Sequence, residues 1–383
     1  MSGKAGKEEV SSTLPRIPVT KAPLVDRLLI LGPPGVGKTE VIKARARELA
    51  LRRGRTFVDL REASAEVIED IAQNPQRYFL FLRVIAPHVF PEDIALPQPH
   101  PHANYVVPRP LLFFYLFTLE GVEGVLFIDE LNNVQRDDQL SMYFSLILEK
   151  ELAYNVRLSP GVLVVAAGNT GEWSEVARAL PLPLINRLTV LYVTAPTVEE
   201  WERYTLEKAF SEGRALDARV IAFLKVSKKP LIEPPPPGVE NVNFPTPRGW
   251  TELAFLLPQL PEELWEAACV GRLGPQAGRE LYAFLAAAVD ETMLDALARD
   301  PATFTTLSPG QQANAIFMLS RREVKELKVR YSKLVEYLAE RHKEMAVLLV
   351  AMMDKAKRAD FITQFLHAYK GVIDVIKKYH YGG

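Results

Sequence analysis

A glycine-rich segment at residues 32–39 carries the clearest chemical signal in the sequence. It reads Gly-Pro-Pro-Gly-Val-Gly-Lys-Thr and fits the pattern G-x-x-x-x-G-K-[ST], which a chain of this length contains by chance only about once in a hundred. Small residues let backbone N–H groups approach a phosphate, while Lys38 reaches its outer oxygens and the Thr39 hydroxyl can ligate Mg²⁺. The residues expected to bind phosphate are Gly32, Pro33, Pro34, Gly35, Val36, Gly37, Lys38, Thr39 and Glu40.

Two carboxylates follow an apolar run at residues 125–128. Parallel sheets bind ligands at the carboxyl ends of their strands, so Asp129 and Glu130 are expected at such an edge. Asp129 suits a role in holding Mg²⁺ through water, and Glu130 suits the activation of an attacking water. Together with the glycine-rich segment, they predict phosphoryl transfer to water.

Three further polar residues complete the candidate site. Asn169 follows the apolar run at 162–166 and is expected to orient a water against the terminal phosphate. Arg187 and Arg248 offer planar cations suited to the charge that develops on a transferred phosphoryl group. Arg178 is a rival to Arg187 in this role, and the sequence does not decide between them.

The elements that must position these residues form an alternating pattern. A strand at 28–31 precedes the glycine-rich segment, and a helix at 39–50 follows it. Further buried strands are expected at 125–128, 162–166 and 189–193, with helical segments between them. Runs at 56–60 and 78–85 also resemble strands, but the pattern does not show which of them joins the main sheet. We expect a flexible tail over residues 1–21 and an α/β domain with a five-stranded parallel sheet over residues 22–195.

Helical signals replace strand signals after Pro196. We expect an all-α domain over residues 196–290 and a helical extension over residues 291–383. Apolar residues at alternating three- and four-residue spacing from Val324 to Met352 predict one long amphipathic helix. A second apolar stripe from Ile362 to Ile376 predicts that the extension ends in a helical hairpin.

Composition excludes several classes of protein. The chain has 383 residues, of which 48% are hydrophobic and 24% charged, which argues against a wholly disordered chain. With 46 basic and 47 acidic residues, the net charge of −1 provides no overall attraction for nucleic acid. The longest apolar runs fall short of the ~20 residues of a membrane span, so no membrane insertion is expected. A single cysteine, Cys269, forms no internal disulfide and fits the reducing cytoplasm.

Residues 28–250 together resemble the MoxR-like, helix-2-insert branch of AAA+ ATPases. The motifs stand in that family's order, with residues 32–39 as Walker A, 125–130 as Walker B, Asn169 as sensor 1, Arg187 as arginine finger and Arg248 as sensor 2. Residues 91–108 resemble the family's insert, and residues 151–160 resemble its hairpin before sensor 1. Ala95 stands where the family usually has glycine, and Asn186 where it usually has an acidic residue.

This resemblance implies a P-loop αβα domain followed by a helical lid, with ATP and Mg²⁺ as ligands. It also implies a ring, commonly a hexamer, in which the finger acts on the neighbouring subunit's site. Hydrolysis would then remodel a protein substrate or partner, and by analogy that partner contains a von Willebrand A domain.

Two other functions stay open at this point. The chain could be a DNA-directed motor or loader of the same superfamily, although the sequence does not favour nucleic-acid binding. It could also be a scaffold in which ATP binding alone docks a partner through the C-terminal hairpin. His100 and His102, two residues apart in a proline-rich loop, could share a metal, but the sequence shows no third ligand.

Overall fold

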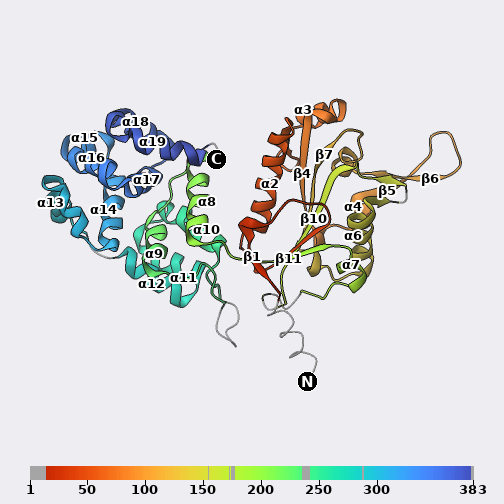
Figure 1. Cartoon of the computed structure of the whole chain (residues 1–383), viewed down its shortest axis with the longest axis horizontal. Helices are drawn as coiled ribbons and strands as arrows, with labels where there is room; N and C mark the ends of the chain where they lie inside the picture. Colours follow the sequence, from red (N-terminus) through yellow and green to blue (C-terminus); the bar gives the residue numbers. More distant parts are fainter. Residues whose placement is uncertain are drawn as a thin grey trace, which may run out of the picture. The chain divides into compact units, whose positions relative to one another are not determined.

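The computed structural model describes residues 14–153, 155–171, 173, 177–234, 242–286 and 289–380 (Figure 1). The chain divides into two compact units, Met1–Ala195 and Pro196–Gly383, and each is considered by itself. Within the described ranges, every helix is too short or too polar to cross a membrane.

A parallel sheet forms the centre of the first unit. Its seven strands follow the order β1-β11-β2-β10-β7-β4-β3, and every pairing is parallel. The strands are β1 (Arg16–Pro18), β2 (Leu28–Leu31), β3 (Thr56–Asp59), β4 (Tyr78–Ile85), β7 (Glu123–Asp129), β10 (Gly161–Gly168) and β11 (Thr189–Thr194). The expected α/β fold with a parallel sheet is confirmed.

The prediction of five strands is wrong by two. Both undecided runs join the sheet, as β3 at its edge and β4 next to β7. β1 pairs with β11, although its residues were expected to belong to the flexible tail. A three-residue strand with the sequence Arg-Ile-Pro is too short to produce a periodic signal, so only the pairing reveals it.

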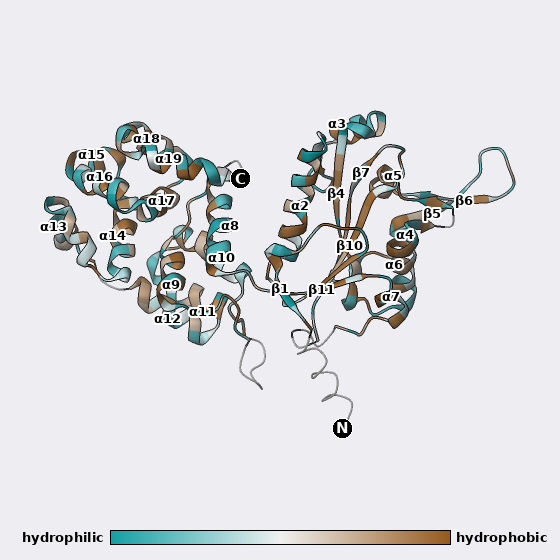
Figure 2. Cartoon of the chain, in the orientation of Figure 1, coloured by the Kyte–Doolittle hydropathy of each residue, from teal (hydrophilic) through white to brown (hydrophobic). Residues whose placement is uncertain are grey.

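Helices cover both faces of this sheet. They are α2 (Lys38–Arg52), α3 (Ala65–Gln73), α4 (Pro91–Ile94), α5 (Leu112–Leu116), α6 (Asp137–Glu149) and α7 (Leu182–Ile185). α2 lies on one side and α6 and α7 on the other (Figure 1). Leu126 and Ile128 of β7 join the core beneath α6, whereas the alternate residues Val125 and Phe127 are buried toward α2. Burial on both faces explains the continuous apolar strands, seen along β4, β7 and β10 in Figure 2.

Two hairpins extend from the first unit. β5 (Ala95–Pro99) pairs antiparallel with β6 (Val106–Pro110) in the segment that resembles the family insert. β8 (Glu151–Ala153) pairs antiparallel with β9 (Val156–Arg157) in the segment expected before sensor 1. Ala95, which replaces the family glycine, adopts an extended conformation as the first residue of β5, so no special backbone freedom is needed there.

The second unit is helical throughout its described residues. Its helices are α8 (Val198–Ser211), α9 (Arg219–Ser227), α10 (Pro247–Leu256), α11 (Trp265–Leu273), α12 (Pro275–Leu285), α13 (Glu291–Arg299), α14 (Pro309–Arg321), α15 (Val324–Arg330), α16 (Ser332–Arg341), α17 (Lys343–Ala351), α18 (Lys355–Gln364) and α19 (Leu366–His380). One hydrophobic core contains residues from Trp201 to Ile376. Side chains on both sides of residue 290 therefore pack in the same core, and the domain boundary predicted at that residue does not separate two cores.

The single long helix predicted over residues 324–352 is wrong, because the segment forms α15, α16 and α17. Tyr331 and His342 leave the helical conformation, with φ/ψ of −119°/11° and −133°/59°. The Tyr331 hydroxyl donates to Asp295 Oδ1 at 3.3 Å, and the His342 ring packs against Phe304. These contacts with α13 and the turn after it favour the breaks, and the apolar spacing continues across them because all three helices face one core.

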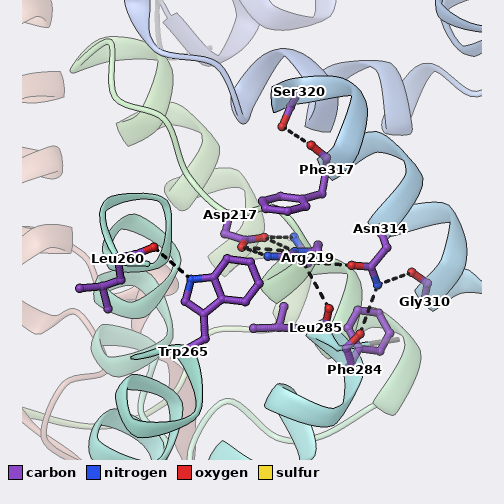
Figure 3. A network of polar contacts seen from close by, with 10 residues as sticks. All are labelled: Asp217, Arg219, Leu260, Trp265, Phe284, Leu285, Gly310, Asn314, Phe317 and Ser320. Carbon is purple, nitrogen blue, oxygen red and sulfur yellow. Dashed lines mark hydrogen bonds and ion pairs between the residues drawn. The ribbon is translucent and has the colours of Figure 1, made fainter. Parts of the chain in front are cut away.

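A buried ion pair lies inside this second core (Figure 3). Arg219 Nη2 is 2.7 Å from Asp217 Oδ2, and Nη1 donates to Asn314 Oδ1 at 3.0 Å. The guanidinium also lies against the rings of Trp265 and Phe317, at 4.6 and 3.4 Å from their centroids. Since each polar group has partners, the core holds two charges without leaving either unsatisfied.

Candidate functional site

The glycine-rich segment connects β2 to α2, so it lies at the amino terminus of a 15-residue helix. Gly37, the residue before this helix, has a φ of 97°, which a residue with a side chain rarely adopts. A Cβ at Gly32 would lie 2.7 Å from the backbone oxygen of Val193, so glycine also allows β11 to pass close by. The segment presents backbone N–H groups and the positive end of the helix dipole, which together attract a phosphate.

Lys38 is buried, with 8% of its surface exposed. Its ammonium donates to the carbonyl oxygens of Gly32 and Pro33 at 2.9 Å each and to Asn169 Oδ1 at 3.0 Å. Lys38 therefore connects the glycine-rich segment to the end of β10. A phosphate bound here would compete with these oxygens for the ammonium protons.

Asp129, the last residue of β7, is the centre of a second cluster. The Thr39 hydroxyl donates to its Oδ2 at 3.0 Å, and Arg83 of β4 donates to the same oxygen through Nε at 2.9 Å. Arg83 Nη2 lies 2.7 Å from that oxygen. The backbone N–H of Glu130 donates to Oδ1 at 3.0 Å. Both carboxylate oxygens are therefore fixed in position.

Glu130 adopts a left-handed backbone conformation, with a φ of 58°. This conformation is uncommon for residues other than glycine and is often found at functional sites. The Asn133 amide donates to Glu130 Oε2 at 3.2 Å, and the Asn133 backbone N–H donates to the Glu130 carbonyl at 2.9 Å. The Asn133 side chain thus holds the Glu130 carboxylate within its own turn.

Asn169 follows the last residue of β10. Besides accepting from Lys38, it is held by Asn132, whose amide donates to the Asn169 carbonyl at 2.6 Å and accepts from the Asn169 N–H at 3.1 Å. The structure therefore connects Lys38, Asp129, Glu130 and Asn169 through a continuous set of contacts at the carboxyl ends of β2, β7 and β10. This edge is where a parallel sheet usually binds its ligand.

The donor set at Asp129 fits a magnesium ion. Mg²⁺ prefers oxygen ligands and is usually bound by one or two protein oxygens together with substrate phosphates. The Thr39 hydroxyl and Asp129 Oδ2 provide two such oxygens 3.0 Å apart, next to the glycine-rich segment. Arg83 contacts the same oxygen, so a metal ion bound there would share it with the guanidinium.

None of the contacts described above involves the remaining predicted residues. Glu40 is exposed in the first turn of α2. Arg187 follows α7, has 61% of its side chain exposed and lies 3.6 Å from Glu149. Arg178 donates to Asp137 Oδ1 at 2.8 Å and to the Gln135 carbonyl at 3.0 Å. Arg248 is exposed at the start of α10, in the second unit.

The two histidines of the β5–β6 hairpin contact each other and a tyrosine. The His102 N–H donates to His100 Nδ1 at 3.2 Å, and the His100 ring centroid lies 4.8 Å from that of Tyr105. Among the described residues there is no cluster of three or more His, Cys, Asp or Glu side chains that could hold a metal ion.

Sequence reasoning missed Arg83 and Asn132. Arg83 is the only charged residue in the run 78–85, which is a signal that could have singled it out. Its role depends on register, because β4 and β7 pair so that Arg83 lies opposite Phe127, two residues before Asp129. Asn132 gave no signal, since asparagine is common in the turns that follow strands.

Comparisons with known proteins find no matching family model and no match among curated proteins. Solved structures do match at low similarity. NtrX from Brucella abortus in complex with ADP is 16% identical, with 96% of this chain and 69% of that chain covered and a TM-score of 0.34. A mutant RuvB from Thermotoga maritima is 15% identical, with 83% and 80% covered and a TM-score of 0.33. Hsp104 with ATPγS and casein is 15% identical, with 86% and 49% covered and a TM-score of 0.33. At these scores the likeness carries no argument about activity.

Proposed function

We propose that this chain hydrolyses ATP in an Mg²⁺-dependent reaction, as an AAA+ ATPase of the MoxR-like type. One observation carries the proposal: Lys38, Thr39, Asp129, Glu130 and Asn169 meet at the carboxyl ends of three adjacent parallel strands. Phosphoryl transfer depends mainly on positioning and charge neutralisation, and these five residues supply a cation, two metal ligands, a base and an orienting amide.

Each residue has a defined task in this reaction. Lys38 would exchange its carbonyl partners for phosphate oxygens, and Thr39 and Asp129 would hold Mg²⁺, whose positive charge would offset the negative charge of the phosphates. Glu130 accepts a proton from the attacking water, and Asn169 orients that water. The turn at Glu130 supports its role, because the partner that it gives the carboxylate is a neutral one, the Asn133 amide at 3.2 Å.

Phosphate release measured with ATP and Mg²⁺ tests this proposal. Glu130→Gln should lower kcat roughly 100-fold or more while nucleotide still binds, because only the base is lost. Lys38→Ala should weaken nucleotide binding itself. Glu92→Gln, an exposed acidic residue of α4, is the matched control and should leave kcat within about twofold of wild type. An inactive wild-type chain, or an active Glu130→Gln variant, would refute the proposal.

We further propose that Arg187 acts on the site of a neighbouring subunit in a ring, commonly a hexamer. Two observations support this role: 61% of the Arg187 side chain is exposed, and its Nη1 atom lies 3.6 Å from Glu149 Oε1 in a surface ion pair. Surface ion pairs are weak, so the side chain can leave Glu149 and reach another molecule. Mixed complexes of Glu130→Gln and Arg187→Ala subunits provide the test. If the finger acts between subunits, about a quarter of the sites in a random mixture regain both intact groups, and activity returns. Mixed complexes without activity would remove Arg187 from this role and favour Arg178.

The work of the ring would be to remodel a protein partner in the cytoplasm, by resemblance one with a von Willebrand A domain. Exposed apolar side chains on the β5–β6 hairpin and α5 support contact with another polypeptide, because such patches are typical of interaction surfaces. They include Leu96, Tyr105, Val106, Leu112 and Tyr115. Arg248 would act as sensor 2, and its variant Arg248→Ala should lower kcat.

A further inference from the structure

Asn132 lies three residues after Asp129, in the short helical turn Leu131–Asn133 that follows β7. It is 6% exposed. Its side-chain amide both donates to the Asn169 carbonyl, at 2.6 Å, and accepts from the Asn169 N–H, at 3.1 Å. A single side chain therefore contacts both backbone polar groups of the residue that directly follows the neighbouring strand β10.

This contact begins where the backbone pairing of the two strands ends. The register between β10 and β7 runs from Gly161 opposite Glu123 to Ala166 opposite Ile128. This pairing ends at Ala166, and polar backbone groups inside a protein are rarely left unpaired. The Asn132 side-chain amide provides a partner for both the N–H and the C=O of Asn169, three residues beyond the last backbone pair.

Two neighbouring residues fit this arrangement. A Cβ on Gly168 would lie 2.3 Å from Asn132 Oδ1, so glycine at this position makes room for the amide. The Asn132 backbone carbonyl accepts from the Arg178 N–H at 2.9 Å, which holds Asn132 from its other end. Asn132 is therefore held through both its backbone and its side chain.

We propose that Asn132 is a positioning residue for hydrolysis, which sets the place of the Asn169 side chain relative to Lys38 and Glu130. The inference rests on the proposed ATPase function. Asn132 belongs to the same turn as Glu130, and its side chain contacts the backbone of Asn169. The Asn132 side chain therefore sets the distance between the Glu130 carboxylate, which is the base, and the Asn169 side chain, which orients the water. Misplacement of a reacting group by about 1 Å can lower a rate roughly 100-fold.

A double-mutant cycle in kcat distinguishes positioning from a general loss of structure. Asn132→Ala should lower kcat roughly 10- to 100-fold. In the Asn169→Ala background the same change should cost less than about twofold, because the side chain that Asn132 positions is already gone. The affinity for a fluorescent ATP analogue should stay within about threefold of wild type, since the phosphate-binding segment keeps its contacts.

Two more variants complete the experiment. Asn132→Asp is nearly isosteric and keeps an acceptor for the Asn169 N–H, but it replaces the donor with an oxygen facing the Asn169 carbonyl. Asn132→Asp should therefore also lower kcat, and it keeps the test valid if Asn132→Ala folds poorly. Asn74→Ala removes an amide that donates to Asp70 at 2.7 Å elsewhere in the first unit, and it should change kcat by less than about twofold.

Hydrogen exchange at the backbone N–H of Asn169, measured without nucleotide, adds a measurement that does not depend on turnover. Exchange should accelerate at least about tenfold in Asn132→Ala and stay unchanged in Asn74→Ala. Equal kcat losses in both backgrounds of the cycle, or unchanged exchange, would overturn the inference while leaving ATPase activity intact. A wild-type chain without ATPase activity would instead refute the proposed function, and this inference with it.

Discussion

Arg83 should control how tightly the site binds Mg²⁺. Its Nε and Nη2 groups lie 2.9 and 2.7 Å from Asp129 Oδ2, the same oxygen that accepts from Thr39. A metal ion bound directly by Asp129 and Thr39 must share or replace this contact. Arg83→Gln removes the positive charge while keeping a shorter polar side chain, and we expect it to raise the apparent affinity for Mg²⁺.

The size of this effect follows from the contact that the metal must displace. A hydrogen bond between charged groups contributes roughly 1.5–3 kcal/mol, and every 1.4 kcal/mol is about tenfold in affinity. Because 27% of the Arg83 side chain is exposed, water weakens the pair, and the lower end of the range applies. The Mg²⁺ concentration for half-maximal effect should therefore fall by about tenfold in Arg83→Gln.

Two measurements check this value. The first is the Mg²⁺ dependence of phosphate release, and the second is the binding of Mn²⁺ in the presence of ADP, followed by electron paramagnetic resonance. Arg53→Gln is the matched control, because Arg53 forms an exposed ion pair with Glu123 at the opposite end of β7. This control should leave both midpoints unchanged within about twofold.

An unchanged or higher midpoint in Arg83→Gln would refute the reasoning. It would mean that Arg83 and the metal do not compete for Asp129, for instance because water separates the metal from the carboxylate. Arg83 would then serve to orient Asp129, and its removal would lower kcat without any change in the metal midpoint.

Three other variants or conditions test further parts of the structure. Arg219→Met leaves the buried Asp217 carboxylate without its ion-pair partner and should lower the free energy of unfolding by about 3–5 kcal/mol in urea titrations. The double variant Asp217→Leu/Arg219→Met should lower it less, and a loss below about 1 kcal/mol for the single variant would contradict this reasoning. Burial raises the pKa of Cys269 from 9.0 to about 12, so the thiol of the folded protein should resist Ellman's reagent. The free energy of unfolding that this burial contributes below about pH 9 should be lost as the pH rises toward 12. Rapid labelling under native conditions would contradict the burial. Gly168→Ala should push against Asn132 and lower kcat about tenfold, whereas Gly171→Ala, where a Cβ has nothing within 4 Å, should not; equal effects of the two changes would contradict the packing.

The glycine-rich segment and the two carboxylates could be singled out from the sequence because their residue types carry meaning without knowledge of the fold. A loop that wraps a phosphate needs glycines and a lysine at fixed spacing, and Asp129 and Glu130 end an apolar strand. Local chemistry specified these parts of the site, and the structure places them together.

Arg83 and Asn132 were not predictable, because their contacts arise between strands rather than along one. Arg83 reaches Asp129 only because β4 lies beside β7 in one particular register, and the sequence did not decide whether residues 78–85 join the sheet. The breaks at Tyr331 and His342 were missed for a similar reason. A periodic apolar stripe shows that a segment faces a core, but it does not show whether one helix or three do so.

The first and last helices of the second unit are neighbours. The Phe210 ring of α8 stacks on the Tyr379 ring of α19 with centroids 6.1 Å apart, and Arg358 of α18 donates to the Ala209 carbonyl at 3.3 Å. α8 is also the helix that directly follows the boundary between the two units. A force applied to α19 is therefore transmitted to α8 through a single contact layer.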